Sequence, residues 1–398
     1  MTLMERRARI RTIAEEAKAW RREMHRHPQT MYEETFASGL VVERLTEWGI
    51  PHETGFAGTG VVATIEGQSP EMGPVIAFRA DMDALDIAEE TGLEWSSMYP
   101  GKMHACGHDG HTATLLALGK YLHETRRFQG KVRLVFQPAE EGGRGANRMM
   151  EDGLLEKYPF DEIYGWHNYP YAPLGEFSIC PGYMMAAADF FEVRLTGKGG
   201  HAAMPQVCTD VIVAGSQMVT ALQTLVSREM DPQEAVVLSV TTFQSGTGAC
   251  NVLPASAMLN GTVRTFKPEL RDRMEARMRE VVRHVAEMFR MEHTMEYKRL
   301  IDATFNHAES VEYCRDSVAK LYGEEKLKVQ KPVTGGEDFG SFLDQRKGAF
   351  MFVGQGAEDR GSVHSQGLHT SRFDFNDAVI PLVVEYMADL AETRGAMD

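Results

Sequence analysis

The sequence predicts an α/β protein in two modules: a discontinuous domain on a mixed, mainly parallel sheet, and an inserted ferredoxin-like (βαββαβ) domain. Three observations lead to this prediction. The chain has 398 residues, more than a typical single domain. Apolar strand-like runs alternate with helical segments in its first half. Between residues 186 and 300 the order of elements changes. We therefore expect one discontinuous domain over 1–185 and 301–398, with a second, compact domain inserted over 186–300.

The first module starts with two amphipathic helices, predicted over 3–26 and 36–48. Four short apolar runs follow as predicted strands, over 61–65, 75–79, 132–137 and 162–166, with a helix over about 109–123 between the second and the third. Sheets of this kind carry their chemistry on the loops that leave the carboxyl ends of strands. Asp81, Asp83, Glu140, Glu141 and His167 all follow such runs.

The inserted module reads as strand, helix, two strands, helix and strand. The predicted elements are a strand around residues 191–195, a helix over 210–229, strands over 235–243 and 258–266, a helix over 270–290 and a strand over 294–300. This order is the ferredoxin-like plan. A helix over 310–322, a strand over 349–353 and a helix over 377–392 then return to the first module.

Composition excludes several classes of function. The net charge of −15 disfavours nucleic acid and anionic membranes as partners, because both attract clustered positive charge. No apolar run approaches the roughly 20 residues that a membrane-spanning helix needs. The first 20 residues are charged and lack the apolar segment of a signal peptide. Five scattered cysteines do not form a disulfide framework. We expect a cytoplasmic protein.

The stretch His104-Ala-Cys106-Gly-His108-Asp-Gly-His111 carries the strongest chemical signal. It places a thiol and three imidazoles, the ligands that borderline transition metals prefer, within eight residues. The glycine between Cys106 and His108 allows the backbone to bend so that both side chains face one point. The alternative is an inert loop cysteine near surface histidines.

Three further segments add potential ligands. Glu140 and Glu141 lie in a glycine-rich turn after a strand, where one carboxylate can bind a cation while the other serves as a general base. His167 follows a strand, and His364 and His369 share a loop near the C-terminus. Taken singly, an acidic surface turn and a structural histidine are the more ordinary interpretations.

In order along the chain, these segments resemble the dinuclear metallopeptidase family of aminoacylase, hippurate hydrolase and indoleacetyl-amino acid amidohydrolase. The matching motifs are WRREMHRHP, DMDAL, HACGHDGHTA, FQPAEEGG, GWH, GKGGHAAMP, NVLP, GTVRTF, TGGEDFG and HTSRFDFND. The resemblance covers essentially the whole chain and implies the same two-domain architecture with a dimerising lid. The chain departs from the family pattern at Gln29, Asp86 and Ser371, and this weakens any assignment to one substrate.

The resemblance implies two divalent metal ions per chain, Mn²⁺ or Zn²⁺. Their implied ligands are Cys106, His108, Glu141, His167 and His369. His364 competes with His369, and we choose His369 because the sequence FDFND follows it at the family's spacing. Glu140 is the implied general base, which takes a proton as a bridging hydroxide forms and passes that proton to the leaving amine.

The inserted domain supplies implied substrate contacts. His201, in the GKGGHAAMP turn, is implied to stabilise the oxyanion in the partner subunit of a homodimer. Asn251 and Arg264 are the candidates for holding a substrate carboxylate, since a guanidinium pairs bidentately with carboxylate. Gly335 and Gly336 would let the backbone approach the substrate, and Asp83 would orient a ligand. His104 and His111 are interpreted as packing or helix-entry residues.

The predicted function is hydrolysis of a small N-acyl-L-amino acid to a carboxylate and a free amino acid. The nearest alternative is a dipeptidase or carboxypeptidase that uses the same dinuclear site. A non-catalytic metal- or ligand-binding homologue is a second alternative, although such proteins usually lose the base or a ligand, and all six residues are present here. A structural zinc module is disfavoured because such sites close with four ligands and need no adjacent Glu.

Overall fold

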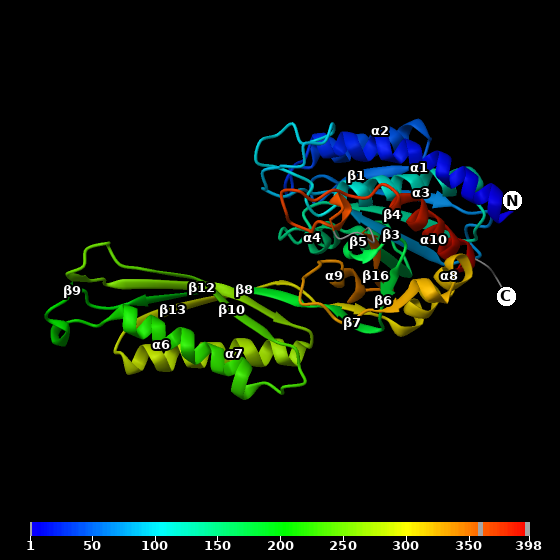
Figure 1. Ribbon diagram of the computed structural model, residues 1–398. Coiled ribbons are helices and arrows are strands. Elements are labelled where there is room, and N and C mark those ends of the chain that lie inside the picture. Colours follow the sequence, from blue (N-terminus) through cyan, green and yellow to red (C-terminus); the bar gives the residue numbers. More distant parts are fainter. Residues whose placement is uncertain (1, 357–360, 395–398) are drawn as a thin grey trace. The chain divides into compact units, whose positions relative to one another are not determined.

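The computed structural model describes residues 2–356 and 361–394. The chain divides into two compact units (Figure 1). The larger unit comprises Met1–Met184, Phe305–Lys331 and Asp338–Asp398. The smaller unit comprises Met185–Thr304 and Pro332–Glu337. The chain returns from the smaller unit to the larger one after Thr304, whereas the predicted boundary was residue 300. Residues 332–337 form a further segment of the smaller unit.

The larger unit is built on an eight-stranded mixed sheet. In spatial order the strands are β1 (His52–Phe56), β2 (Gly60–Glu66), β4 (Lys131–Gln137), β3 (Val75–Asp81), β5 (Glu162–Pro173), β16 (Lys347–Gly356), β6 (Phe177–Ile179) and β15 (Leu327–Val329). The central strands β4, β3, β5 and β16 run parallel to one another, whereas β1, β2 and β6 introduce antiparallel pairs. The predicted mixed, mainly parallel sheet is confirmed.

Helices pack against this sheet and against one another. The long helices are α1 (Leu3–Arg26), α2 (Thr35–Glu47), α3 (His108–Thr125), α8 (Ala308–Tyr322) and α10 (Val379–Arg394), and the short ones are α4 (Gly145–Glu151), α5 (Leu154–Lys157) and α9 (Gly340–Leu343). Helices α1, α3 and α10 contact each other. Leu134 of β4 packs against Gly119 of α3. Gln137 points to the opposite face because side chains alternate along a strand. Both faces of β4 are therefore covered.

Two predicted strands are longer than the sequence suggested. β3 continues to Asp81, which pairs with Gln137 of β4, and β5 continues to Pro173. His167 was expected just beyond a strand but lies inside β5, where it pairs with Phe352 of β16. Polar residues ended the apolar runs in the sequence, whereas backbone pairing with the neighbouring strand extends the elements past them.

The smaller unit has the predicted ferredoxin-like arrangement. Its elements are β8 (Ala187–Thr196), α6 (Val211–Thr224), β10 (Val237–Ser245), β12 (Ser256–Thr265), α7 (Pro268–Met288) and β13 (Glu292–Ile301). The sheet order is β10-β12-β8-β13, with every pair antiparallel. The predicted helix over 210–229 becomes α6 followed by a π-helical turn, Leu225–Glu229. A separate core of buried apolar side chains holds this unit together.

Short elements complete both units. They are the strands β7 (Gly182–Met185), β9 (Gly200–His201), β11 (Val252–Leu253) and β14 (Thr304–Asn306), and the 3₁₀ turns Pro205–Val207, Glu324–Lys326 and Val363–Ser365. Among the described residues, no helix combines the length and the apolar character that crossing a membrane requires. The five cysteines all lie in this part of the chain, and each is a free thiol.

Candidate metal centre

The loop into α3 brings Cys106 and His108 to the carboxyl end of the sheet. Gly107 is the N-cap residue of α3 and has a φ of 99°, a conformation that favours glycine. A Cβ atom at this position would lie 2.6 Å from Oδ1 of Asn168, a residue of β5. Glycine is thus required both by the backbone conformation and by the close approach of β5. The tight turn places Cys106 next to His167 of the same strand.

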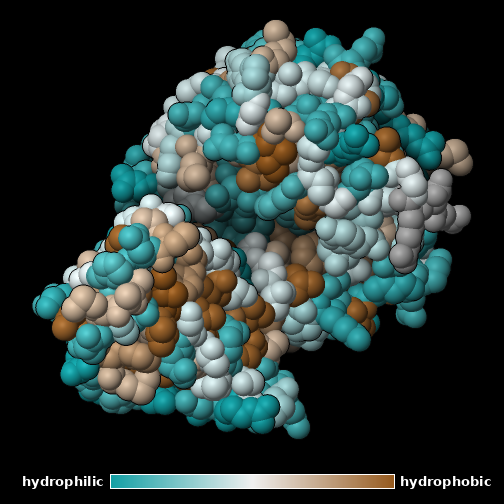
Figure 2. All heavy atoms as spheres, turned by 60° about the vertical axis from the view of Figure 1, so that its left-hand side comes forward, coloured by the Kyte–Doolittle hydropathy of each residue, from teal (hydrophilic) through white to brown (hydrophobic). Residues whose placement is uncertain are grey.

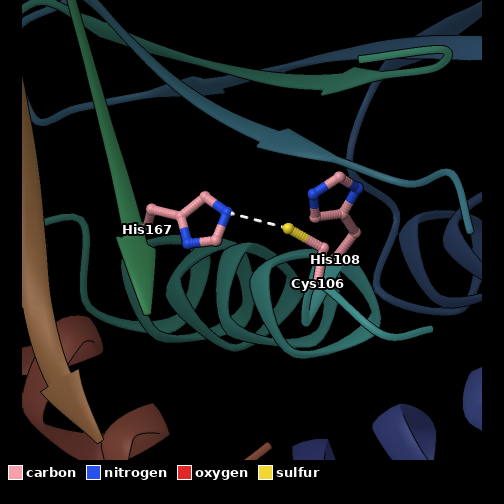
Figure 3. Close-up of side chains that lie close together, drawn as sticks. All are labelled: Cys106, His108 and His167. Carbon is pink, nitrogen blue, oxygen red and sulfur yellow. Dashed lines mark hydrogen bonds between the residues drawn. The ribbon is translucent and has the colours of Figure 1, made fainter. Parts of the chain in front are cut away.

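Cys106, His108 and His167 form the first cluster of potential ligands (Figure 3). The Sγ of Cys106 lies 3.3 Å from Nε2 of His167. One ligand atom from each of the three residues lies within 4.8 Å of the other two, and all three side chains are buried. A thiol and two imidazoles are a donor set that suits zinc and neighbouring transition metals.

Two further clusters share members with the first. Cys106 groups with Glu141 and His369, and the Nε2 of His369 lies 3.0 Å from Oε1 of Glu141. His108 groups with Glu140 and Glu141. Together the three clusters bring all five predicted ligands and the predicted base to one place. The rival candidate, His364, instead lies beside Asp374, with Nδ1 3.3 Å from Oδ2.

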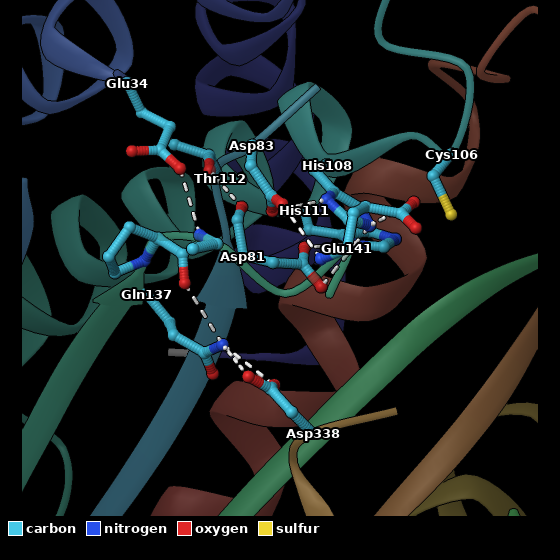
Figure 4. Close-up of polar contacts among 12 residues, drawn as sticks. Glu34, Asp81, Asp83, Cys106, His108, His111, Thr112, Gln137, Glu141 and Asp338 are labelled. Carbon is cyan, nitrogen blue, oxygen red and sulfur yellow. Dashed lines mark hydrogen bonds and ion pairs between the residues drawn. The ribbon is translucent and has the colours of Figure 1, made fainter. Parts of the chain in front are cut away.

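Asp83 connects two of these side chains (Figure 4). Its Oδ1 lies 3.1 Å from Nδ1 of His108, and its Oδ2 accepts the backbone N–H of Glu141 at 2.9 Å. A carboxylate that accepts a hydrogen bond from the Nδ1–H of a histidine fixes the tautomer in which Nε2 is free to act as a ligand. Asp83 thus contacts the His108 side chain and the Glu141 backbone, and its role in orienting a ligand stays a prediction.

Two buried polar atoms at the site fit a bound cation. Nε2 of His108 has no hydrogen-bond partner in the described structure, and Oε1 of Glu141 forms no hydrogen bond there beyond its 3.0 Å ion-pair contact with Nε2 of His369. Buried polar atoms are almost always partnered in folded proteins, so the unpartnered imidazole nitrogen needs an explanation. Both are good ligand atoms for a divalent transition metal. The residues present thus fit the pair of ions that the sequence implied.

Burial controls the protonation of two of the predicted ligands. Burial, then the nearby Glu141 and Glu140 carboxylates, raise the pKa of Cys106 well above its ordinary value. Burial, together with the neighbouring His111, lowers the pKa of His167. These shifts favour the thiol of Cys106 and the neutral imidazole of His167. Binding a cation at Cys106 must release the thiol proton.

His111 is hydrogen-bonded through both ring nitrogens in addition to its packing contacts. Its Nδ1 lies 2.6 Å from Oδ1 of Asp81, and its Nε2 lies 2.7 Å from Oδ1 of Asn168. Asn168 in turn donates to Oε1 of Gln355 on β16 at 3.1 Å. This buried chain links three strands behind the cluster. Asn168 and Gln355 had no recognisable signal in the sequence, whereas Asp81 and His111 belonged to matched motifs without an assigned contact.

The predicted substrate residues lie in the smaller unit. The backbone carbonyl of Asn251 accepts from the N–H of Ala202, so Asn251 and His201 are close together at the two-stranded sheet of β9 and β11. Arg264 on β12 lines a cavity of about 430 Å³ on the sheet. A Cβ at Gly335 would make only an ordinary contact, 3.6 Å from Cε of Met185, whereas a Cβ at Gly336 would meet the side chain of Ile301 at 2.6 Å. Packing within the unit already accounts for Gly336.

A mixed sheet covered by helices, an inserted ferredoxin-like unit and a thiol–imidazole–carboxylate cluster beside a second glutamate are together the features of a metal-dependent hydrolase. The chain belongs to peptidase family M20/M25/M40, whose model matches residues 77–393. The family resemblance drawn from the motifs is confirmed.

Similar proteins share both the sequence and the fold. A hippurate hydrolase of Campylobacter jejuni is 36% identical over 373 residues, covering 93% of this chain and 94% of its own. An N-acetyl-L-cysteine deacetylase of Bacillus subtilis is 38% identical over 348 residues, covering 87% and 82%. The crystal structure of a dinuclear metal binding peptidase of the M20 family from Bacillus subtilis superposes with a TM-score of 0.82 at 31% identity, covering 96% and 98%.

Proposed function

We propose that this protein hydrolyses N-acyl-L-amino acids to a carboxylic acid and a free amino acid, using two divalent metal ions. The observation that carries the proposal is the convergence of Glu140 with Cys106, His108, Glu141, His167 and His369 in overlapping clusters. The similarity to a hippurate hydrolase and to an N-acetyl-L-cysteine deacetylase supports the substrate class, because both names describe amides formed on the nitrogen of an amino acid.

In the proposed site the five ligand residues would hold the ions, and Mn²⁺ and Zn²⁺ both suit the mixed donor set. Two divalent cations bound there would polarise the substrate carbonyl and lower the pKa of the attacking water. Glu140 accepts the proton of that water at its carboxylate as the C–O bond forms. It then delivers the proton to the amide nitrogen as the C–N bond breaks, so that a neutral amine leaves. Asp83 keeps His108 and the backbone of Glu141 in place throughout.

Residues of the smaller unit complete the proposal. Arg264 and Asn251 are assigned to the substrate carboxylate, with Gly335 and Gly336 beside the substrate. His201 is assigned to the oxyanion of the substrate bound in the partner subunit. This last role requires a homodimer.

A dimer through the smaller unit is supported by its exposed apolar surface. Side chains that are 39–51% exposed gather on and around α6 and the neighbouring turns: Met204, Val207, Ile212, Val213, Phe243 and Val252. Figure 2 shows apolar side chains clustered on this unit. Strand β10 is an edge of the sheet and offers unpaired backbone groups. Exposed apolar patches of this kind are typical of interfaces.

The deciding experiment combines metal analysis with a substrate panel. We expect about two equivalents of metal per chain, activity that a chelator removes, and turnover of hippurate, N-acetyl-methionine or indoleacetyl-alanine in preference to a dipeptide. A preference for the dipeptide would instead identify a dipeptidase on the same site. A metal-loaded protein with no turnover of any compound would favour a binding homologue.

A further inference from the structure

A short segment between α1 and α2 contacts the turn that carries the two site glutamates. Glu34, at the start of α2, is fully buried although it carries a carboxylate. Its Oε1 accepts the backbone N–H of Ala139 at 3.0 Å and that of Tyr32 at 2.9 Å. Its Oε2 accepts the hydroxyl of Thr59 at 2.6 Å. Figure 4 shows Glu34 reaching the end of β4 from the side opposite Asp338.

The same segment contacts the far end of the turn. The hydroxyl of Tyr32 donates to the backbone carbonyl of Gly143. Ala139 and Gly143 therefore lie on either side of Glu140 and Glu141 in the chain, and each forms a hydrogen bond with the segment 32–34. Neither hydrogen bond involves an atom of a proposed ligand or of the base.

The backbone at this turn needs such support. Ala139 has a φ of 55° and Tyr32 a φ of 66°, the left-handed region that non-glycine residues avoid. Backbone in this region persists where surrounding contacts over-determine it, and it concentrates at functional sites. The Glu34 carboxylate contacts the N–H groups of both strained residues.

We propose that Tyr32 and Glu34 are positioning residues that hold the turn 139–143 so that the Glu140 carboxylate is aligned for proton transfer. The catalytic consequence rests on the proposed function, whereas the mechanical part of the inference does not. Proton transfer requires the carboxylate within hydrogen-bond reach of its partner, and misplacement by about 1 Å can cost up to about 100-fold in rate. Asp83 also bonds the backbone of Glu141, so the loss of one hydrogen bond to the segment 32–34 makes the turn more mobile but does not unfold it.

The mechanical part is tested by hydrogen exchange on the metal-free protein. Tyr32→Phe removes one hydroxyl at a partly exposed position, and Glu34→Ala removes the buried carboxylate. Glu34→Gln keeps an oxygen for Ala139 and an NH₂ group for Thr59. Amides of the peptide 139–145 should exchange roughly fivefold faster in Tyr32→Phe, the factor expected for one lost hydrogen bond. They should exchange faster still in Glu34→Ala, which removes three hydrogen bonds, and near the wild-type rate in Glu34→Gln.

Tyr158→Phe is the matched control, because its hydroxyl donates to Glu53 at 3.0 Å and touches no part of this turn. It should leave exchange over 139–145 unchanged. Should Glu34→Ala fail to fold, Tyr32→Phe alone decides the question. Wild-type protection of this peptide in Tyr32→Phe would overturn the inference whatever the activity of the protein.

The catalytic part is tested by kinetics on the metal-loaded protein. Tyr32→Phe should lower kcat about tenfold, with KM and the two metal equivalents unchanged, and Tyr158→Phe should match the wild type. A wild-type kcat in Tyr32→Phe would overturn the catalytic part. A wild-type protein with no turnover would count against the proposed function, and the exchange result would still stand by itself.

Discussion

Glu140 and Glu141 are neighbours in sequence, and the structure gives them different surroundings. Glu141 has its backbone N–H bonded to Asp83, and its carboxylate lies 3.0 Å from His369. Burial alone would raise the pKa of Glu141, but the contacts with His369 and His108 lower it, so Glu141 stays ionised as a ligand should. Glu140 shares a cluster with His108 and Glu141, whose side chains are both proposed ligands. This arrangement suits a base beside the ligands.

Replacing Glu140 with glutamine should separate metal binding from chemistry. The amide keeps the size of the side chain and leaves the five ligands untouched, but it cannot accept the proton of the attacking water. We expect two metal equivalents by elemental analysis and a loss of kcat of at least about 100-fold, the usual contribution of a general base. Near-wild-type turnover would mean that another residue is the base.

A second residue-scale prediction concerns His25, which is buried on α1. Burial alone would lower its pKa, but the Asp109 carboxylate, 2.8 Å from Nδ1, and Glu89 outweigh burial and raise the pKa to about 9. Folded protein thus binds this proton more tightly than unfolded protein does. The resulting stability is fully present below about pH 6.5, the ordinary histidine pKa, and is lost as the pH rises towards 9.

Denaturant unfolding of the chelator-treated protein at pH 6 and pH 9 measures this effect. The wild type should lose more unfolding free energy over that interval than His25→Gln does. His284→Gln, which changes an exposed histidine of α7, should follow the wild type. Equal pH dependence in wild type and His25→Gln would show that the ion pair does not titrate in this range.

At the scale of elements, the start of α3 is held by contacts from three directions. Its N-cap residue, Gly107, lies against Asn168 of β5. Asp109 in its first turn faces His25 of α1, and His111 faces Asp81 of β3. These contacts fix the start of the helix and therefore the position of His108. A metal site of defined geometry requires ligands on rigid elements of this kind.

Gly107→Ala should disturb this element more than an ordinary glycine substitution does. Gly49 has a φ of 67° and open space around its absent Cβ, so Gly49→Ala measures the backbone cost alone. In Gly107→Ala the added Cβ also meets Oδ1 of Asn168 at 2.6 Å. We expect Gly107→Ala to lose about 1–3 kcal/mol more unfolding free energy than Gly49→Ala, with weaker metal binding, by denaturant unfolding and metal titration. Equal losses would mean that Asn168 moves aside freely.

At the scale of the whole molecule, the apolar surface on α6 bears on assembly. Val213 is 51% exposed on this helix, and a charge there would oppose burial in an interface. Val213→Glu should shift the protein from dimer to monomer in analytical ultracentrifugation. Val329→Glu, which changes a 74% exposed valine of the larger unit, should remain dimeric. A wild-type protein that is monomeric at all concentrations would contradict the dimer, and with it the cross-subunit role of His201.

The sequence by itself determined the elements and the donor residues of this protein. Hydrophobic periodicity placed the long helices and the starts of the central strands to within a few residues, because amphipathic burial is encoded in local spacing. The order of strands and helices determined the inserted ferredoxin-like unit. Cys106, His108, Glu140, Glu141, His167 and His369 were identifiable because their side chains are chemically distinctive and lie in matched motifs.

Tertiary structure alone decided how those residues are held. Glu34 bonds the N–H of a residue 105 positions away, and Asp83 bonds one 58 positions away. The acceptor carboxylates are ordinary residues in the sequence, and their partners are backbone groups, which every residue except proline carries. No local pattern specifies such a contact. It exists because the parallel sheet brings the carboxyl ends of distant strands to one edge, where the chain between α1 and α2 also passes.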